Sequence, residues 1–196
     1  MSVIIESQPL QPLEPVLRTW IECVRQYVAV WGGEDLPYWY NEQSNVSVLC
    51  GAAWRAGWTA LEEYQVGRIG DEAEYGAGRN DLYIANDEHG FCVEAKVAYL
   101  EITDLTAAGT LLAARCALAT ADARSADIEG HKVGAVFAIP YRQGAQASQE
   151  EQQAFIDWLE EKHFAALAWV QPDTEPNLRS HDDRHYPLAA LVLLNA

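Results

Sequence analysis

The chain has 196 residues, of which 49% are hydrophobic; this excludes a disordered polypeptide and indicates one globular domain with a substantial core. Its formal net charge of −16 excludes a surface that is basic throughout, although most nucleic-acid-binding proteins offer a basic face to phosphate. No apolar run is long enough to span a membrane, no secretory signal opens the chain, and the four cysteines form no Cys-x-x-Cys pair, so we expect a cytoplasmic protein with reduced thiols.

The first forty residues predict an arm, a helix and a loop. Residues 1–15 contain three prolines, which favours an extended arm. Apolar residues at helical spacing predict an amphipathic helix from Val16 to about Tyr27. The aromatic and turn-rich segment that follows, residues 31–40, either packs on the core or offers rings on which bases stack. Residues 16–40 are therefore interpreted as a helix and an aromatic loop.

Residues 41–141 predict elements in the order α-β-β-β-α-β. In chain order we expect a helix over 45–56, a strand over 59–66, a loop over 67–79, a two-stranded hairpin, a helix over 105–123 capped by Asp104 or Thr103, and a strand over 132–139. Residues 142–196 add a helix opened by the capping box Ser148–Glu151 and the apolar strands 166–170 and 188–194. The fold class is α/β, with a central mixed sheet flanked by helices.

The predicted hairpin between residues 81 and 100 contains most of the candidate catalytic residues. A polar turn, Asn86–Gly90, separates the run Leu82–Ile84 from the run that begins at Phe91. If the loop has an even length, Asn86 faces Phe91. Counting outward from that pair, Tyr83 faces Glu94 and Asp81 faces Lys96.

This register predicts a charged group on one face of the sheet. Side chains alternate along a strand, so Asp81, Glu94 and Lys96 project on the same side. The two carboxylates become diagonal neighbours about 7–8 Å apart, a separation that a shared cation bridges. An odd loop or a bulge would place them on opposite faces.

An ordinary cross-strand salt bridge is the alternative explanation for Glu94 and Lys96. The pattern Glu-x-Lys recurs at Glu160-Glu161-Lys162, where it belongs to a solvated helix face. The context of Lys96 differs, because it lies in a strand expected to be buried, where a lysine needs a partner or a function. The chain has only three lysines against ten arginines.

Asp81, twelve intervening residues and then Glu94-Ala95-Lys96 resemble the core motif of the PD-(D/E)XK nuclease superfamily, which includes restriction endonucleases, phage exonucleases and Holliday-junction resolvases. Asn80 stands where the motif has its proline. The resemblance covers about Asn41 to Tyr141 and implies a restriction-endonuclease-like core with an N-terminal helical extension and C-terminal strand additions.

The resemblance implies metal-dependent hydrolysis of phosphodiester bonds. Asp81, Glu94 and the backbone carbonyl of Ala95 would ligate Mg²⁺ or Mn²⁺, which prefer oxygen donors. Lys96 would orient the attacking water or stabilise developing negative charge. An acidic residue on the first helix often completes such a site, and Glu42 is the candidate, with Glu62 and Glu63 as competitors. Glu42 is equally compatible with a carboxylate that favours the helix dipole.

The expected partner is nucleic acid, DNA before RNA. Arg79, Arg68 and Gln65 are weak candidates for contacts with it, and Arg55 and Arg115 extend a potential basic patch. The net charge supports a second hypothesis, a catalytically inactive nuclease-fold module whose acidic surface docks on a basic protein partner. A homo-oligomer also stays open.

Overall fold

The computed structural model describes residues 1–69, 75–128 and 130–196, and of residues 68, 69 and 75–77 it describes only the backbone. The described strands are β1 (Ser2–Ile5), β2 (Thr59–Ile69), β3 (Tyr75–Ala85), β4 (Gly90–Glu101), β5 (Ala126–Asp127), β6 (His131–Gln143), β7 (Ala166–Val170), β8 (Arg184–His185) and β9 (Ala189–Asn195). The helices are the 3-10 helix η1 (Gln8–Leu13) and the α-helices α1 (Glu14–Val30), α2 (Glu42–Arg55), α3 (Leu105–Ser125) and α4 (Gln149–Glu160).

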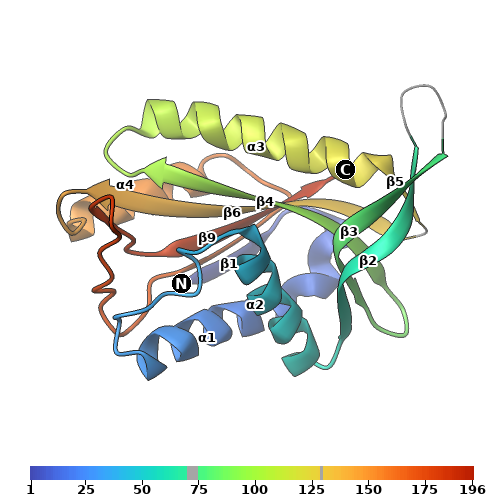
Figure 1. Cartoon of the computed structure of the whole chain (residues 1–196), viewed down its shortest axis with the longest axis horizontal. Coiled ribbons are helices and arrows are strands. Elements are labelled where there is room, and N and C mark those ends of the chain that lie inside the picture. Colours follow the sequence, from blue (N-terminus) through green and yellow to red (C-terminus); the bar gives the residue numbers. More distant parts are fainter. Residues whose placement is uncertain (70–74, 129) are drawn as a thin grey trace.

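A mixed sheet runs through the centre of the molecule, with strands in the order β1-β7-β9-β6-β4-β3-β2-β5, and β8 pairs with β6 beside it. Helices α1 and α2 lie on one face of the sheet and α3 on the other (Figure 1). The predicted α/β class, with a mixed sheet between helices, is therefore confirmed. None of the helices in the described residues has both the length and the apolar character needed to cross a membrane.

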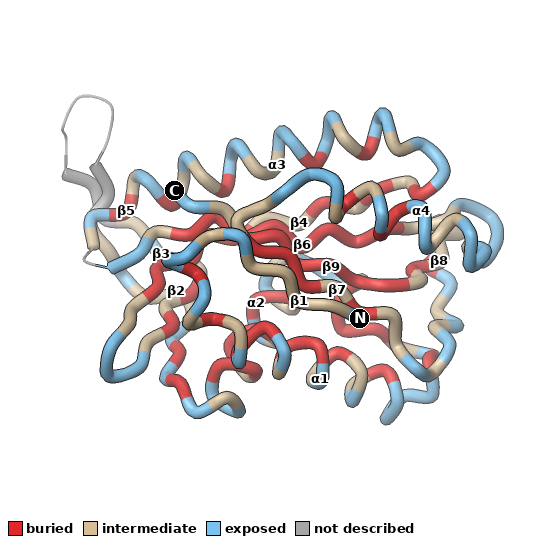
Figure 2. The backbone as a smooth tube through the Cα atoms, turned by 180° about the vertical axis from the view of Figure 1, so that it is seen from behind, coloured by how far each residue is buried: buried red, intermediate tan, exposed pale blue. Residues whose placement is uncertain are grey.

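Two hydrophobic cores fill the spaces between the sheet and its helices. The larger one, on the side of α1 and α2, includes Trp20, Phe91 and Phe137, while the smaller one joins α3 and α4 to the sheet through Leu112 and Phe155. Figure 2 shows the result, with buried backbone concentrated in the central strands and on the inner sides of the helices.

The N-terminal segment is more ordered than an extended arm. Residues 2–5 form β1, which pairs antiparallel with β7 at one edge of the sheet. Helix α1 begins at Glu14, two residues before the predicted start, because Pro15 is compatible with the first helical turn. Its side chains at every fourth position, Val16, Trp20, Val24 and Val28, are buried.

The element order α2-β2-β3-β4-α3-β5-β6 agrees with the predicted α-β-β-β-α-β order apart from the two-residue strand β5, which was not predicted. The prediction of a loop over 67–79 was wrong at both ends, because β2 runs to Ile69 and β3 starts at Tyr75. The glycines in this segment suggested a loop. Strand pairing nevertheless includes Gly67, Gly76 and Gly78, with Gly78 opposite Val66. Pairing with a partner strand outweighs the low intrinsic preference of glycine for strands. Residues 70–74 of the predicted loop lie outside the described residues.

Strands β4 and β6 are parallel, so the chain must cross over between them, and α3 makes that crossover. Of the two predicted caps for α3, Asp104 is the one observed, and its side chain accepts a hydrogen bond from the N–H of Ala107 at 2.9 Å. Gly134 lets α3 lie close to β6. A Cβ at this position would lie 2.9 Å from the backbone nitrogen of Thr120 and 3.0 Å from the carbonyl carbon of Ala119.

The hairpin register differs from the prediction by two residues. Ala85 lies opposite Gly90, and Tyr83 lies opposite Cys92. The loop is therefore Asn86–His89, closed by the Asn86 side chain, which accepts hydrogen bonds from the N–H groups of Glu88 and His89 at 3.0 and 2.7 Å.

A shift of two residues keeps the faces of the paired residues of both strands. Counted on from the Tyr83–Cys92 pair, Asp81 corresponds to Glu94, where the prediction placed it opposite Lys96. The ladder ends before this position, at the Leu82–Val93 pair, so the shared face of Asp81 and Glu94 stays a prediction.

Candidate active site

The site lies where β3 separates from β4. The ladder between these strands ends at the Leu82–Val93 pair, while β4 continues alongside β6 to Glu101. Just beyond this point, the carboxylate of Asp81 accepts a hydrogen bond from the backbone N–H of Ala95 at 2.7 Å. The buried side chain of Asn80 donates hydrogen bonds to the carbonyl oxygens of Leu82 and Val93 at 2.9 and 3.3 Å. Asn80 and Asp81 therefore bond to backbone groups on both sides of the fork in the sheet.

Glu42 reaches the same fork from the start of α2. Asn41 caps this helix by accepting a hydrogen bond from the N–H of Ser44, which makes Glu42 its first residue. The Glu42 carboxylate accepts a hydrogen bond from the backbone N–H of Val97, two residues along β4 from Ala95. Asp81 and Glu42 thus bond to alternate backbone N–H groups on the stretch of β4 that has left β3.

The carboxylates of Glu42 and Asp81 are close enough to repel one another. Burial raises the pKa of Glu42 above its usual range, and the charge of Asp81 adds to this increase. Lys96, the Val97 N–H and Arg115 act in the opposite direction without cancelling it. The Glu42 carboxyl therefore ionises less readily than an exposed glutamate.

Lys96 projects from β4 toward α3. Its Nζ donates a hydrogen bond to the carbonyl oxygen of Ala95 at 2.9 Å and pairs with the Asp122 carboxylate on α3, also at 2.9 Å. Burial alone lowers the pKa of Lys96, but the hydrogen bond to Asp122 and the charges of Glu42, Asp122 and Asp81 outweigh it and raise the pKa above its usual range. Lys96 is therefore an ammonium at neutral pH, and it acts as a hydrogen-bond donor.

Among Asp81, Glu42, Lys96 and Glu94, Glu94 is the most buried, with 3% of its surface exposed. It lies opposite Gly134 in the register between β4 and β6. The hydroxyl of Tyr64 lies near Glu94 and Cys92, and burial together with these neighbours raises the pKa of Tyr64. Glu94 thus occupies a more enclosed environment than Lys96, whose side chain is 20% exposed.

A cleft of about 510 Å³ opens beside the fork. Its lining includes four carboxylates, and the residues are Asn41, Glu42, Gln43, Val46, Ser47, Glu62, Glu63 and Asp81. The predicted competitors Glu62 and Glu63 therefore join Glu42 and Asp81 around one cleft. Glu62 accepts a hydrogen bond from Ser47 at 3.1 Å.

Glu63 has an unusual backbone conformation, with φ at +52°. The ladder between β2 and β3 pairs Glu62 with Leu82 and Tyr64 with Asn80, and omits Glu63 and Asp81 between them. On a regular strand, Glu62 and Glu63 would point to opposite faces, yet both line the cleft. Positive φ in a non-glycine residue is strained, and such strain concentrates at functional sites.

The basic residues are only partly gathered at this site. Arg79 pairs with Glu63 at 3.2 Å, and the exposed Gln65 lies opposite Arg79 in the ladder. Arg115 faces Glu42, and its buried Nε has no hydrogen-bond partner among the residues that the structure describes. Arg55 instead bonds to Gln26 on α1 at 2.8 Å. The side chain of Arg68 lies outside the described part of the chain.

Asp122, which pairs with Lys96, was not among the predicted site residues. In the sequence it is an unremarked acid inside an alanine-rich helix. Its position in the helix pointed toward the sheet. Asp122 lies between Ala119 and Ala123, which are fully buried and belong to the helix face that packs on the sheet. Across the described residues, no three histidine, cysteine, aspartate or glutamate side chains stand together as a ready-made metal cluster.

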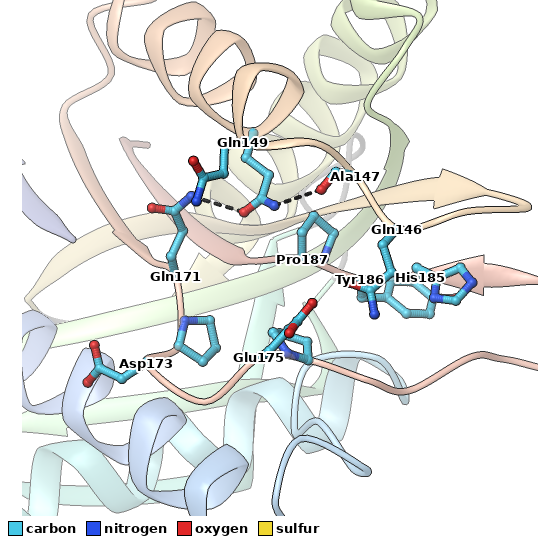
Figure 3. Close-up of a pocket in the computed structure, with 12 residues that line it drawn as sticks. Gln146, Ala147, Gln149, Gln171, Asp173, Glu175, His185, Tyr186 and Pro187 are labelled. Carbon is cyan, nitrogen blue, oxygen red and sulfur yellow. Dashed lines mark hydrogen bonds between the residues drawn. The ribbon is translucent and has the colours of Figure 1, made fainter.

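A second cavity, of about 460 Å³, lies beside α4 and contains none of the predicted site residues. Figure 3 shows side chains from several segments around it, including Gln171, Glu175 and Pro187. Its amides bond to one another, since Gln171 donates to Gln152 at 3.0 Å and Gln152 donates to the carbonyl of Ala147 at 2.9 Å. The carboxylates of Asp173 and Glu175 also line this cavity, but the described residues around it include no lysine of the kind that stands at the fork.

Comparisons of the chain with protein-family models, with curated proteins and with solved structures found no significant match.

Proposed function

We propose that the chain is a metal-dependent nuclease with a restriction-endonuclease-like core, which hydrolyses phosphodiester bonds in nucleic acid, with DNA preferred over RNA. The observation that carries this proposal is the convergence of Asp81, Glu42 and the Lys96 ammonium on the fork between β3 and β4, next to a cleft lined by carboxylates. The element order α2-β2-β3-β4-α3-β5-β6, with β4 and β6 parallel, supports the fold part of the proposal.

The residues at the fork fit a hard divalent cation. Asp81, Glu42, Glu94 and the carbonyl of Ala95 are oxygen donors of the kind that Mg²⁺ and Mn²⁺ prefer. The raised pKa of Glu42, caused by burial and by the charge of Asp81, supports a site that gains from a cation, because a cation reduces the repulsion between these carboxylates. When bound, such a cation neutralises phosphate charge and makes a water molecule more acidic.

The remaining chemistry belongs to side chains of the chain itself. Asp81 and Glu42 are held by the N–H groups of Ala95 and Val97, so the carboxylates are oriented before a substrate arrives. Lys96 stays charged, and its ammonium can donate to a phosphate oxygen or to the attacking water. Glu62 and Glu63 on β2 add two further carboxylates to the lining of the cleft.

A second candidate function is supported by the net charge of −16. In this alternative, the chain is a catalytically inactive module with the same fold, and its acidic surface docks on a basic protein partner. Such a module has no use for a lysine at the fork. The Lys96 ammonium lies close to Glu42 and Asp81 instead of pointing away from them, and this favours the enzyme.

Calorimetric titration with Mg²⁺ and Mn²⁺ distinguishes the two functions. The wild type is compared with Asp81→Ala/Glu94→Ala and with a control, Glu150→Ala/Asp157→Ala, which removes two exposed carboxylates from α4. The same proteins are then incubated with plasmid DNA, single-stranded DNA and RNA in the presence of each metal.

The proposal predicts that the wild type and the control bind metal and cleave DNA, and that the site variant does neither while it remains folded. A folded wild type that neither binds metal nor cleaves any of these nucleic acids would refute the enzyme and favour the docking module.

A further inference from the structure

Asp122 is held beside the site by the close packing of α3. The helix rests on β6 at Gly134, where no side chain separates the two backbones. Ala119 and Ala123, which flank Asp122 on the helix, are fully buried. This packing leaves the backbone of Asp122 little freedom to move relative to the sheet, so its carboxylate lies close to β4.

The Lys96 ammonium is shared between two acceptors. Its Nζ lies 2.9 Å from the Ala95 carbonyl oxygen on its own strand and 2.9 Å from Oδ2 of Asp122. The lysine side chain is 20% exposed and that of Asp122 is 44% exposed, so the pair lies at the boundary between the core and solvent. A flexible lysine side chain adopts one position more readily when two acceptors define it.

The pair differs from the surface ion pairs of the molecule. Arg18 and Glu14, for example, are 63% and 45% exposed and lie one turn apart on the same helix. Asp122 instead lies on α3, whereas Lys96 lies on β4. The charges of Glu42 and Asp81 also act on Lys96 and help to raise its pKa. The contact therefore joins α3 to the group of residues at the fork.

We propose that Asp122 is a positioning residue, which fixes the position of the Lys96 ammonium at the fork. The catalytic part of this role rests on the proposed nuclease function. The contact between Asp122 and Lys96 does not depend on that function, because it is present in the folded chain without substrate.

The first test uses lysine-specific NMR on isotope-labelled protein. Because the chain has three lysines, the signals of Lys96, Lys132 and Lys162 can be assigned by substitution. In Asp122→Asn we expect a lower pKa for Lys96 and faster exchange of its Nζ protons with water, with Lys132 and Lys162 unchanged. The control is Asp157→Asn, which alters an exposed carboxylate on α4 that accepts a hydrogen bond from the amide of Gln153.

The second test uses DNA cleavage. We expect Asp122→Asn to lower kcat by about tenfold or more with little change in KM, because small displacements of a catalytic group can cost up to about 10²-fold. The alkaline limb of the pH–rate profile moves to lower pH, since the less stabilised ammonium loses its proton earlier. Asp122→Glu, which keeps the charge, restores part of both losses.

The positioning role and the nuclease function can be refuted independently of each other. An unchanged Lys96 signal and an unchanged pH profile in a folded Asp122→Asn protein would overturn the positioning role. A wild type that binds no metal and cleaves nothing would refute the nuclease, and the NMR titration would still decide whether Asp122 holds Lys96.

Discussion

The carboxylate of Asp81 bonds to the backbone N–H of Ala95, across the point where two neighbouring strands separate. This bond gives Asp81 two roles. It satisfies a backbone donor of Ala95, a residue that is 1% exposed, and it fixes the orientation of a carboxylate at the edge of the cleft.

The two roles of Asp81 can be separated by two substitutions. Asp81→Asn keeps an oxygen that can accept the Ala95 N–H, whereas Asp81→Ala leaves that donor without a partner, at a cost of about 1–3 kcal/mol. We expect both variants to lose metal binding and to lose cleavage by more than about 10²-fold, since changes to groups that only support a metal ligand already cost about 10–100-fold. Denaturant unfolding should show a clear loss of stability for the alanine variant alone. Full cleavage by either variant would remove Asp81 from the site.

Replacing Lys96 should have opposite effects on metal binding and on catalysis. Lys96→Met removes the ammonium beside Glu42 and Asp81, so we expect divalent cations to bind about tenfold more tightly, consistent with the loss of one nearby positive charge. Cleavage should fall by at least about 10²-fold because the donor is lost. Calorimetry and a cleavage assay measure the two effects. The control is Lys162→Met, whose ammonium lies over the Trp158 ring on the surface of α4, and it should change neither.

Glu42 should make the protein less stable as the pH rises. Burial, with the charge of Asp81, raises the pKa of Glu42 above its ordinary value of 4.5, so the folded state holds this proton more tightly than the unfolded state does. The stabilising contribution is complete below the unfolded pKa and is lost as the pH rises through the folded pKa.

The variant Glu42→Gln tests this dependence. It should be more stable than the wild type at pH 7, and this advantage should shrink as the pH falls below about 4.5, where the wild-type carboxyl is protonated too. Urea unfolding at several pH values measures it. Adding Mn²⁺ should stabilise the wild type more than the variant. Equal pH dependence in the two proteins would contradict the raised pKa.

Gly134 should be intolerant of even one methyl group. A Cβ there would lie 2.9 Å from the backbone of Thr120, and backbone on both sides cannot move without displacing α3. We expect Gly134→Ala to lower the free energy of unfolding by about 1–3 kcal/mol.

Gly109 lies on α3, the helix against which Gly134 packs, and provides the control. A Cβ at Gly109 meets only the Trp158 ring, at an ordinary 3.5 Å, so Gly109→Ala should stabilise the helix by about 0.5–1 kcal/mol. Thermal and chemical unfolding compare the two variants. A neutral Gly134→Ala would mean that α3 can shift, and the position of Asp122 would then be less fixed than the packing indicates.

The hairpin illustrates what a sequence predicts and what it leaves open. The alternation of apolar and polar residues indicates which side of the sheet each paired residue faces, so a register shift of two leaves the faces of Tyr83 and Cys92 unchanged. The shared face of Asp81 and Glu94, which lie beyond the paired stretch, stays a prediction. The length of the turn depends on local bonds, such as those from the Asn86 side chain to the N–H groups of Glu88 and His89. With these bonds the loop spans Asn86–His89, and the observed register therefore differs from the predicted one by two residues.

Contacts between elements distant in the sequence were harder to predict. The ion pair of Lys96 with Asp122 depends on how closely α3 approaches the sheet, which Gly134 determines from a third element. The same holds for Glu63, whose positive φ brings it into the cleft against the regular alternation of a strand. Both features arise from tertiary packing and not from local propensity.

The position of β9 has a consequence for synthesis of the chain. Residues 189–195 form an inner strand between β6 and β7, although they are the last of the sheet to be made. Until they leave the ribosome, β6 and β7 each present an unpaired edge rich in apolar side chains, a state prone to aggregation. The nascent chain therefore passes through a stage at which its largest elements are complete but its sheet remains divided.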